Sequence, residues 1–244
     1  MLNKVYQVPY GTKDILPGEM KRRRKIENAI LDIFENWGYE EVKTPGFEYA
    51  DTFGSMVKDS DFRFFDRNNN LLVLRNDMTA PIARLAATRL QQEEGSKRLC
   101  YFANLYRYEE IQMGRQCEFE QAGVEFFGAQ GAEADAEIIA LAVQALQATG
   151  LETFAFSVGH VGFINGLAEE VGFNAEQTAK LKDCLRRHDA VGLQELADSM
   201  EEITPEIKKL FADFLFLIII QVCFLKCMFR IWVILLPAVV VTIK

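Results

Sequence analysis

The chain has 244 residues, of which half are hydrophobic and a quarter charged, and its formal net charge is −8. This composition is typical of a globular protein and excludes a mostly disordered chain. The negative charge argues against a protein whose main task is to grip a phosphate backbone, so we expect no nucleic-acid partner. Five cysteines without a CxxC pair indicate reduced thiols in the cytoplasm, and they predict neither a disulfide framework nor a metal site.

The first third of the chain predicts a long helix followed by short strands. Pro17 suits the first position of a helix over residues 18–37, whose apolar residues recur at helical spacing and which Gly38 ends. A short strand over 39–43 follows. Two further strands are expected over 62–66 and 71–74, joined by an Asn-rich turn. A helix over 80–92 comes next, with Asp77 or Thr79 as its cap.

The middle of the chain predicts two strands, over 99–108 and 118–127, joined by a charged loop in which Gly114 can turn the chain. Glu118, Glu120 and Glu125 are polar positions of the second strand, and Arg107 lies across from them. Two interpretations stay open. These side chains could line a polar cleft for a small zwitterion, or the pair could be an ordinary hairpin with one wet face.

The second half of the chain predicts mostly helix. An Ala-rich helix with an acidic start covers 132–148, and a strand covers 153–158. Further helices are expected over 161–171, 175–187, 189–200 and 204–213. We therefore predict a core domain over 1–158 and a helical insert over 159–213. The two histidines, His160 and His188, have no nucleophilic partner at a recognisable spacing, so we interpret both as structural.

Three stretches, in chain order, resemble a known family. They read YGTKDILPGE at 10–19, LRNDMTAP at 74–81, and RYEEIQMGRQCEFEQAGVE at 107–125. The third is similar to motif 2 of the class II aminoacyl-tRNA synthetases. Within that class the chain resembles histidyl-tRNA synthetase and its non-synthetase paralogue, the regulatory subunit of ATP phosphoribosyltransferase. Residues 18–45 are similar to motif 1, a long helix and a strand that build the family's homodimer interface.

The resemblance implies an α+β fold, a class II antiparallel sheet flanked by helices, here incomplete and with a helical insert. It also implies a histidine-binding pocket and, in the regulatory subunit, no catalytic residue and no cofactor. In that pocket carboxylates and an amide accept from the ammonium and the ring N–H of histidine, and an arginine meets the carboxylate. The matching residues are Asp77, Thr79, Arg107, Gln121 and Glu125.

Two functions compete under this resemblance. One is a regulatory subunit that partners a short-form ATP phosphoribosyltransferase catalytic subunit in a hetero-oligomer and senses histidine as an effector. The alternative is a histidyl-tRNA synthetase, or a fragment of one, that charges tRNA using ATP. Tyr108 and Glu110 stand where the synthetase carries arginines, and an added negative charge there opposes the binding of phosphates. The chain also has neither the Gly-rich motif 3 nor the basic anticodon-binding region of the synthetase, so the regulatory function is favoured. The Tyr-Tyr segment that both relatives carry is absent as well, which indicates a truncated chain.

The tail over residues 214–244 differs abruptly in composition, with three basic residues, no acidic residue and long apolar runs. Three explanations are open: out-of-frame sequence in a truncated chain, a membrane anchor, or an ordinary buried segment. Lys226 and Arg230 interrupt the apolar run, and each costs about 2.5 to 3.5 kcal/mol near the centre of a membrane helix. We therefore favour the first explanation and predict that the chain is not an integral membrane protein.

Overall fold

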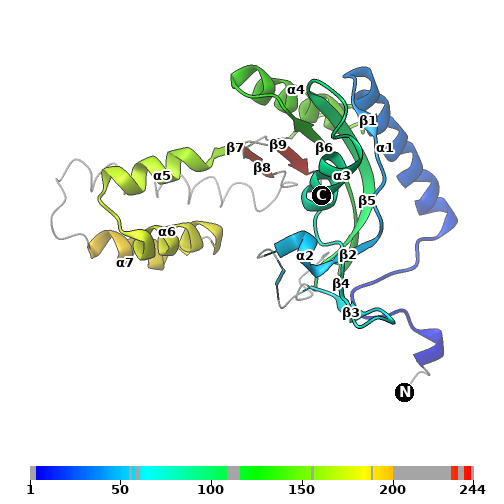
Figure 1. The fold of residues 1–244 in the computed structure, drawn as a ribbon, viewed down its shortest axis with the longest axis horizontal. Helices are drawn as coiled ribbons and strands as arrows, with labels where there is room; N and C mark the ends of the chain where they lie inside the picture. The colour runs from blue at the N-terminus through cyan, green and yellow to red at the C-terminus, as the bar shows by residue number, and fades with distance from the viewer. Residues whose placement is uncertain are drawn as a thin grey trace. The chain divides into compact units, whose positions relative to one another are not determined.

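The computed structural model describes residues 4–54, 57–58, 61–108, 116–154, 157–187, 189–199, 232–235 and 239–242 (Figure 1). The chain divides into two compact units. One consists of Met1–Thr153 and Ile231–Lys244, and the other of Phe154–Arg230. The site discussed below lies entirely in the first unit, which begins with the short 3-10 helix η1 (Lys4–Tyr6).

Helix α1 (Pro17–Asn36) begins and ends at the predicted signals. Pro17 occupies the first turn, where its missing N–H is not needed, and Gly38 adopts a φ of 79° just past the end. Strand β1 (Glu40–Glu41) follows and is shorter than the predicted 39–43. It pairs in parallel with the next long strand, and the Val42 N–H extends the ladder by donating to the Cys100 carbonyl at 2.9 Å.

The centre of this unit is the predicted hairpin of β5 (Lys97–Tyr106) and β6 (Glu118–Phe127). The two strands pair in ten consecutive antiparallel positions, from Lys97↔Phe127 to Tyr106↔Glu118. On its other side β6 pairs with β9 (Val239–Thr242), and β9 pairs with β8 (Trp232–Leu235), so the strand order in this unit is β1-β5-β6-β9-β8. The expected antiparallel sheet flanked by helices is present, and β1 adds a parallel pair at its edge.

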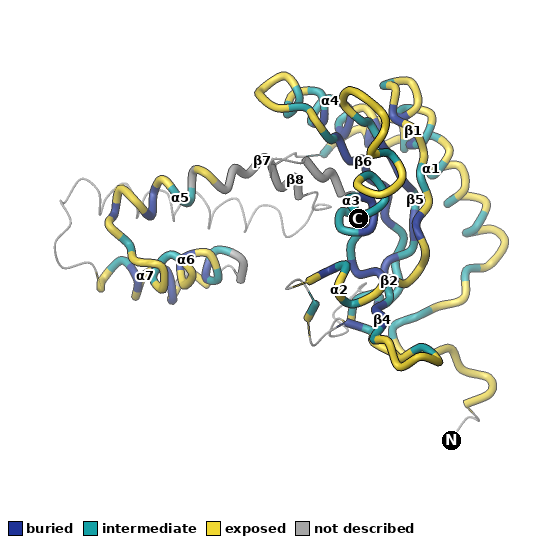
Figure 2. The backbone as a smooth tube through the Cα atoms, viewed as in Figure 1, coloured by how far each residue is buried: buried dark blue, intermediate teal, exposed yellow. Residues whose placement is uncertain are grey.

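The two faces of the hairpin are covered by different helices. On one face, Met78 and Ile82, at the start of α3 (Thr79–Arg89), pack against Leu99, Tyr101 and Leu105. The other face meets α1 and α4 (Ala132–Ala148) through the side chains of the even-numbered residues of both strands. There Arg98 of β5 donates to Glu137 of α4 at 2.8 Å. Figure 2 shows that the middle of β5 and β6 is mostly buried, whereas their ends are partly exposed.

A smaller sheet positions the start of α3. It consists of β2 (Phe47–Tyr49), β3 (Arg63–Phe65) and β4 (Leu71–Leu74) in the order β2-β4-β3, with α2 (Ala50–Phe53) following β2. Directly after β4, the buried Arg75 donates to the carbonyls of Thr44 and Asn104 at 3.0 and 2.7 Å. These bonds tie the small sheet to β5 and fix where the chain enters α3.

The second unit contains β7 (Ser157–His160), α5 (Val161–Glu170), α6 (Ala175–Arg187) and α7 (Ala190–Asp198). Its three helices match the predicted ones closely, whereas the strand begins at Ser157 rather than at 153. Leu181 and Leu193 are at the centre of its core. Asp189 caps α7 by accepting from the Gly192 N–H at 2.9 Å. His188 and the predicted helix over 204–213 lie outside the described residues.

Candidate functional site

The start of α3 brings two of the predicted site residues together with a third on β6. The Thr79 N–H donates to Asp77 Oδ1 at 2.8 Å, and the Thr79 hydroxyl donates to Glu125 Oε1 at 2.9 Å. One residue therefore links both carboxylates. The predicted cap is different in detail, because Met78 is the N-cap residue and Asp77 instead accepts from the N–H of the first helical residue.

Arg107 is held beside Asp77 at the end of β5. Its Nε donates to the Asn76 carbonyl at 2.8 Å, and its guanidinium lies 3.7 Å from Asp77 Oδ2 and 5.3 Å from the centre of the Phe119 ring. The side chains of Arg107 and Asp77 are 28% and 42% exposed, so this end of the site is open to solvent. A cation and an anion at this separation suit the carboxylate and the ammonium of an amino acid.

Gln121 is almost completely buried and contacts Tyr101, which was not among the predicted site residues. Its amide Nε2 donates to the Tyr101 hydroxyl at 2.7 Å. The Tyr101 ring lies across β6 only because Gly123 is opposite it in the register: a Cβ on Gly123 would come 2.4 Å from the Tyr101 hydroxyl. The available signal was a glycine in the middle of a strand, which often marks a close approach by a neighbouring group.

Glu125 lies at the buried end of the site and has no exposed surface. Burial raises the pKa of its carboxyl to about 8. The hydrogen bond from Thr79 lowers this pKa, and the negative charge of Asp77 raises it by a smaller amount. The adjacent Tyr101 hydroxyl also has a raised pKa because it is buried, so it stays neutral. The inner half of the site is therefore uncharged near neutral pH.

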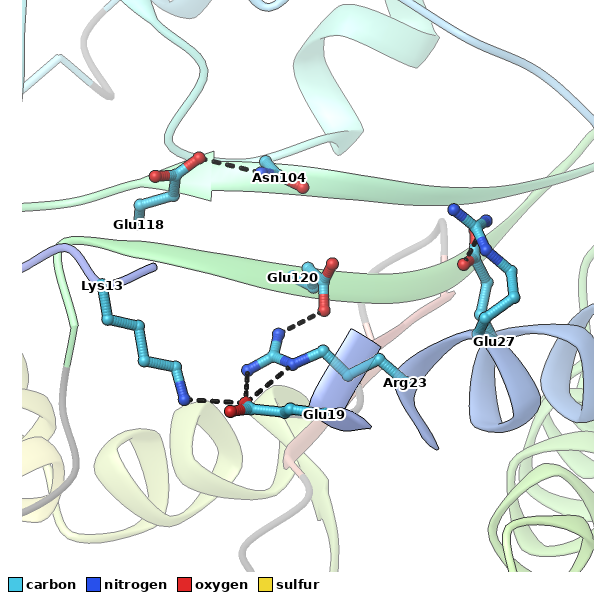
Figure 3. A network of polar contacts seen from close by, with 8 residues as sticks. Lys13, Glu19, Arg23, Glu27, Asn104, Glu118 and Glu120 are labelled. Carbon is cyan, nitrogen blue, oxygen red and sulfur yellow. Dashed lines mark hydrogen bonds and ion pairs between the residues drawn. The ribbon is translucent and has the colours of Figure 1, made fainter. Parts of the chain in front are cut away.

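Glu118 and Glu120 do not belong to this site, which corrects the grouping of polar positions made from the sequence. Side chains alternate along a strand, so these two glutamates point to the face of β6 opposite Glu125. There Glu118 accepts from Asn104 at 2.9 Å, and Glu120 pairs with Arg23 of α1 (Figure 3). A cavity of about 240 Å³ adjoins these residues, and its lining contains none of the five predicted site residues.

The N-terminal signature segment, residues 10–19, contacts the chain just before β6. The Cys117 N–H, just before β6, donates to the Gly11 carbonyl at 2.7 Å, and a Cβ on Gly11 would collide with the Cys117 sulfur. The Cys117 carbonyl in turn accepts from the Arg107 N–H at 2.9 Å. Residues 109–115 of the motif 2 loop, which include Glu110, Gly114 and Arg115, lie outside the described part of the chain.

Comparison with known proteins identifies the family of this chain. A model of the family described as histidyl-tRNA synthetase matches residues 11–217. The chain belongs to that family. All five site residues and all of the three motif stretches except Tyr10 lie within the matched range, whereas most of the tail over 214–244 lies outside it.

Within the family, the chain is similar to regulatory subunits. It is 41% identical over 215 residues to the ATP phosphoribosyltransferase regulatory subunit of Acetivibrio thermocellus and 44% identical over 200 residues to that of Moorella thermoacetica. These alignments cover 86% and 80% of this chain but 51% of each relative. The chain therefore spans about half the length of the curated relatives that it matches.

Among solved structures, the chain is similar to an ATP phosphoribosyltransferase regulatory subunit/histidyl-tRNA synthetase from Bacillus halodurans, with a TM-score of 0.77 and 37% identity over 84% of this chain and 54% of that one. Apo histidyl-tRNA synthetase from S. aureus is similar over 60% of this chain and 40% of its own, with a TM-score of 0.52 and 31% identity.

In the part of the chain that the structure describes, neither a metal site nor a membrane-spanning helix is found. No group of three or more His, Cys, Asp or Glu side chains there could hold a metal ion. No helix there is both long enough and apolar enough to cross a membrane. Residues 214–231, which contain Lys226 and Arg230, lie outside that part of the chain.

Proposed function

We propose that this chain is a non-catalytic regulatory subunit of ATP phosphoribosyltransferase, which binds histidine and passes feedback inhibition to a short-form catalytic subunit in the cytoplasm. The bound histidine would contact Asp77, Thr79, Arg107, Gln121 and Glu125. We further propose a homodimer through α1 and β1 within the hetero-oligomer. The names of the curated relatives support the regulatory role.

The single observation that best supports a sensor over a synthetase is the residue after Arg107. Tyr108 stands where the synthetase carries an arginine. The centre of its ring lies 5.1 Å from the centre of the Phe62 ring and 6.2 Å from that of the Tyr10 ring. An aromatic cluster at this position offers no positive charge to a phosphate. The Asp77–Arg107 pair can still hold an amino acid. A site that binds an amino acid without activating it suits a sensor.

The test is phosphoribosyl transfer by a short-form catalytic subunit, measured with and without this chain and titrated with histidine. The chain should change the activity and make it sensitive to histidine. Regulation requires histidine to bind one state of the complex better than another, and couplings of this kind are about 1 to 3 kcal/mol, or about 5- to 150-fold in affinity. If no complex forms and neither activity nor histidine sensitivity changes, the regulatory function is wrong.

A pair of variants separates the site from general effects. Glu125→Ala should weaken inhibition by histidine and leave the uninhibited activity of the complex largely intact, because within the described residues its carboxyl bonds only to Thr79, another residue of the proposed effector site. Glu152→Ala is the matched control, since it removes a carboxylate from an exposed position of the same unit. Equal histidine sensitivity of the two variants would exclude Glu125 from the effector site.

The second candidate is histidyl-tRNA synthetase activity, which the family match itself favours. Histidine-dependent exchange of pyrophosphate into ATP tests it directly. We expect exchange at background for this chain. Exchange clearly above that of an Arg107→Ala variant would support the synthetase function instead.

A further inference from the structure

Glu125 combines complete burial with a carboxylate oxygen that has no hydrogen-bond donor. Thr79 donates to Oε1, but no donor in the described part of the chain reaches Oε2. A buried carboxylate is strongly disfavoured unless a cation or several donors compensate for lost hydration. With one donor from a neutral hydroxyl, the geometry favours a protonated carboxylic acid while the site is empty.

The groups that face Glu125 from the described elements do not supply a cation. Asp77 approaches from the connection between β4 and α3, and Tyr101 approaches from β5; one is an anion and the other a neutral phenol. Arg107, the cation among the five site residues, lies beside Asp77 and donates to the Asn76 carbonyl. Among the described residues, then, no cation pairs with Glu125, and a bound ligand could supply one.

The geometry also gives the direction in which an amino acid would lie. Its ammonium and carboxylate are bonded to the same carbon, so they stay close together, as Asp77 and Arg107 do at the partly exposed end. The side chain then extends toward the buried end, where Glu125 lies. For histidine, the group that meets Glu125 is the imidazole ring, which can carry a positive charge.

We infer that histidine binds this site with exchange of a proton, so that Glu125 is a carboxylic acid in the empty site and a carboxylate paired with an imidazolium in the occupied one. This inference rests on the proposed histidine-binding function. The O–H bond of Glu125 breaks on binding. Its proton goes to the ring when histidine arrives neutral, and to solvent when histidine arrives already protonated.

The stoichiometry of released protons depends on pH in a defined way. Free imidazole side chains have a pKa of about 6.5. At pH 5.5 most free histidine carries the ring proton, so binding should release about 0.9 proton per histidine. At pH 7.2 the ring is mostly neutral and takes the proton of Glu125 itself, so the net release should be about zero. A binding site that leaves both groups unchanged would release nothing at either pH.

The experiment is calorimetric titration of the 244-residue chain with histidine at both pH values, each in two buffers of different ionisation heat. The difference between buffers gives the number of protons released. Ring-labelled ¹⁵N-histidine, observed by NMR at pH 7.2, should show the bound ring as an imidazolium. Glu125→Gln can neither give up a proton nor pair with an imidazolium, so the ring bound to this variant should be neutral at pH 7.2 and its affinity there should fall at least tenfold. Glu152→Gln should behave as the unmodified chain.

Each outcome bears on a different step. If histidine binds and no proton is released at pH 5.5, or if the bound ring is neutral at pH 7.2, the proton exchange is wrong while the histidine site stands. A bound imidazolium in Glu125→Gln at pH 7.2 would assign the proton to another group and overturn the inference. If histidine does not bind at all, the proposed function fails, and this inference fails with it.

Discussion

Replacing Glu125 by Gln should stabilise the fold at neutral pH relative to acidic pH, because it removes a carboxyl that is costly to ionise. In the folded chain the pKa of Glu125 is raised from 4.5 to about 8, mainly by burial. Between these values the folded state keeps the proton and the unfolded state loses it. The favourable contribution of the neutral acid is therefore complete below about pH 4.5 and is lost as the pH rises towards and through about 8. Glutamine, which is neutral at every pH, has no such dependence.

The size of the effect follows from the shift. Each pH unit inside the window costs about 1.4 kcal/mol per proton. Between pH 5 and 7 the unfolding free energy of the unmodified chain should therefore fall by about 2.5 kcal/mol relative to Glu125→Gln. The amide keeps the shape of the neutral acid and can still accept from the Thr79 hydroxyl. Packing changes should accordingly be small, and the difference between the two chains should lie in its pH dependence.

Urea unfolding at pH 5, 6 and 7, followed by near-ultraviolet circular dichroism, measures this difference. Glu118→Gln is the matched control, because it makes the same chemical change on the other face of the same strand. Thr79→Val gives a second check: the Thr79 hydrogen bond lowers the pKa of Glu125, so removing it should extend the loss of stability to higher pH. The reasoning is refuted if the unfolding free energies of the unmodified chain and of Glu125→Gln differ by the same amount at pH 5 and at pH 7.

Two further variants test the packing around the hairpin. Gly123→Ala places a methyl group 2.4 Å from the buried Tyr101 hydroxyl and should cost about 1 to 3 kcal/mol in urea unfolding, whereas Gly18→Ala, which meets nothing within 4 Å, should be neutral. A Gly123→Ala chain as stable as the control would contradict the close approach. Arg98→Met removes two hydrogen bonds to Glu137, at 2.8 and 2.9 Å, and should cost about 1 kcal/mol at pH 7 because the pair is partly exposed. Arg98 is the main cause of the lowered pKa of Glu137, so this cost should disappear as the pH falls through the carboxylate range; a cost independent of pH would argue against the ion pair.

The long elements could be predicted because local signals and tertiary packing agree. The α1 sequence has a proline at its first turn and a glycine past its end, and the structure uses both. The strands over 97–106 and 118–127 are rich in aromatic and other apolar residues and flank a charged loop. Strand β1 was harder, because only Glu40 and Glu41 pair regularly with β5, and this parallel contact joins segments about 60 residues apart.

The candidate site was only partly predictable from the strand pattern. Polar residues at 118, 120 and 125 look like one wet face if they are counted without regard to parity. In the structure an odd separation places Glu125 on the α3 face and Glu118 and Glu120 on the α1 face. Resemblance to the family selected Asp77, Thr79, Arg107, Gln121 and Glu125. Tyr101 was missed because an aromatic residue in a buried strand looks like ordinary core.

The hairpin separates two kinds of polar chemistry on the two faces of β6. On the α1 face, Glu120 meets Arg23, so the charges there are already paired within the chain. On the α3 face, Glu125 has a hydroxyl donor from Thr79 and no cation among the described residues. Equivalent side chains on one strand therefore serve different ends. The paired glutamate holds an element in place, and the buried one is left to be completed by a ligand. This contrast supports the proposal that histidine binds on the α3 face. A change at Glu125 should then alter histidine binding, whereas a change at Glu120, on the α1 face, should alter stability.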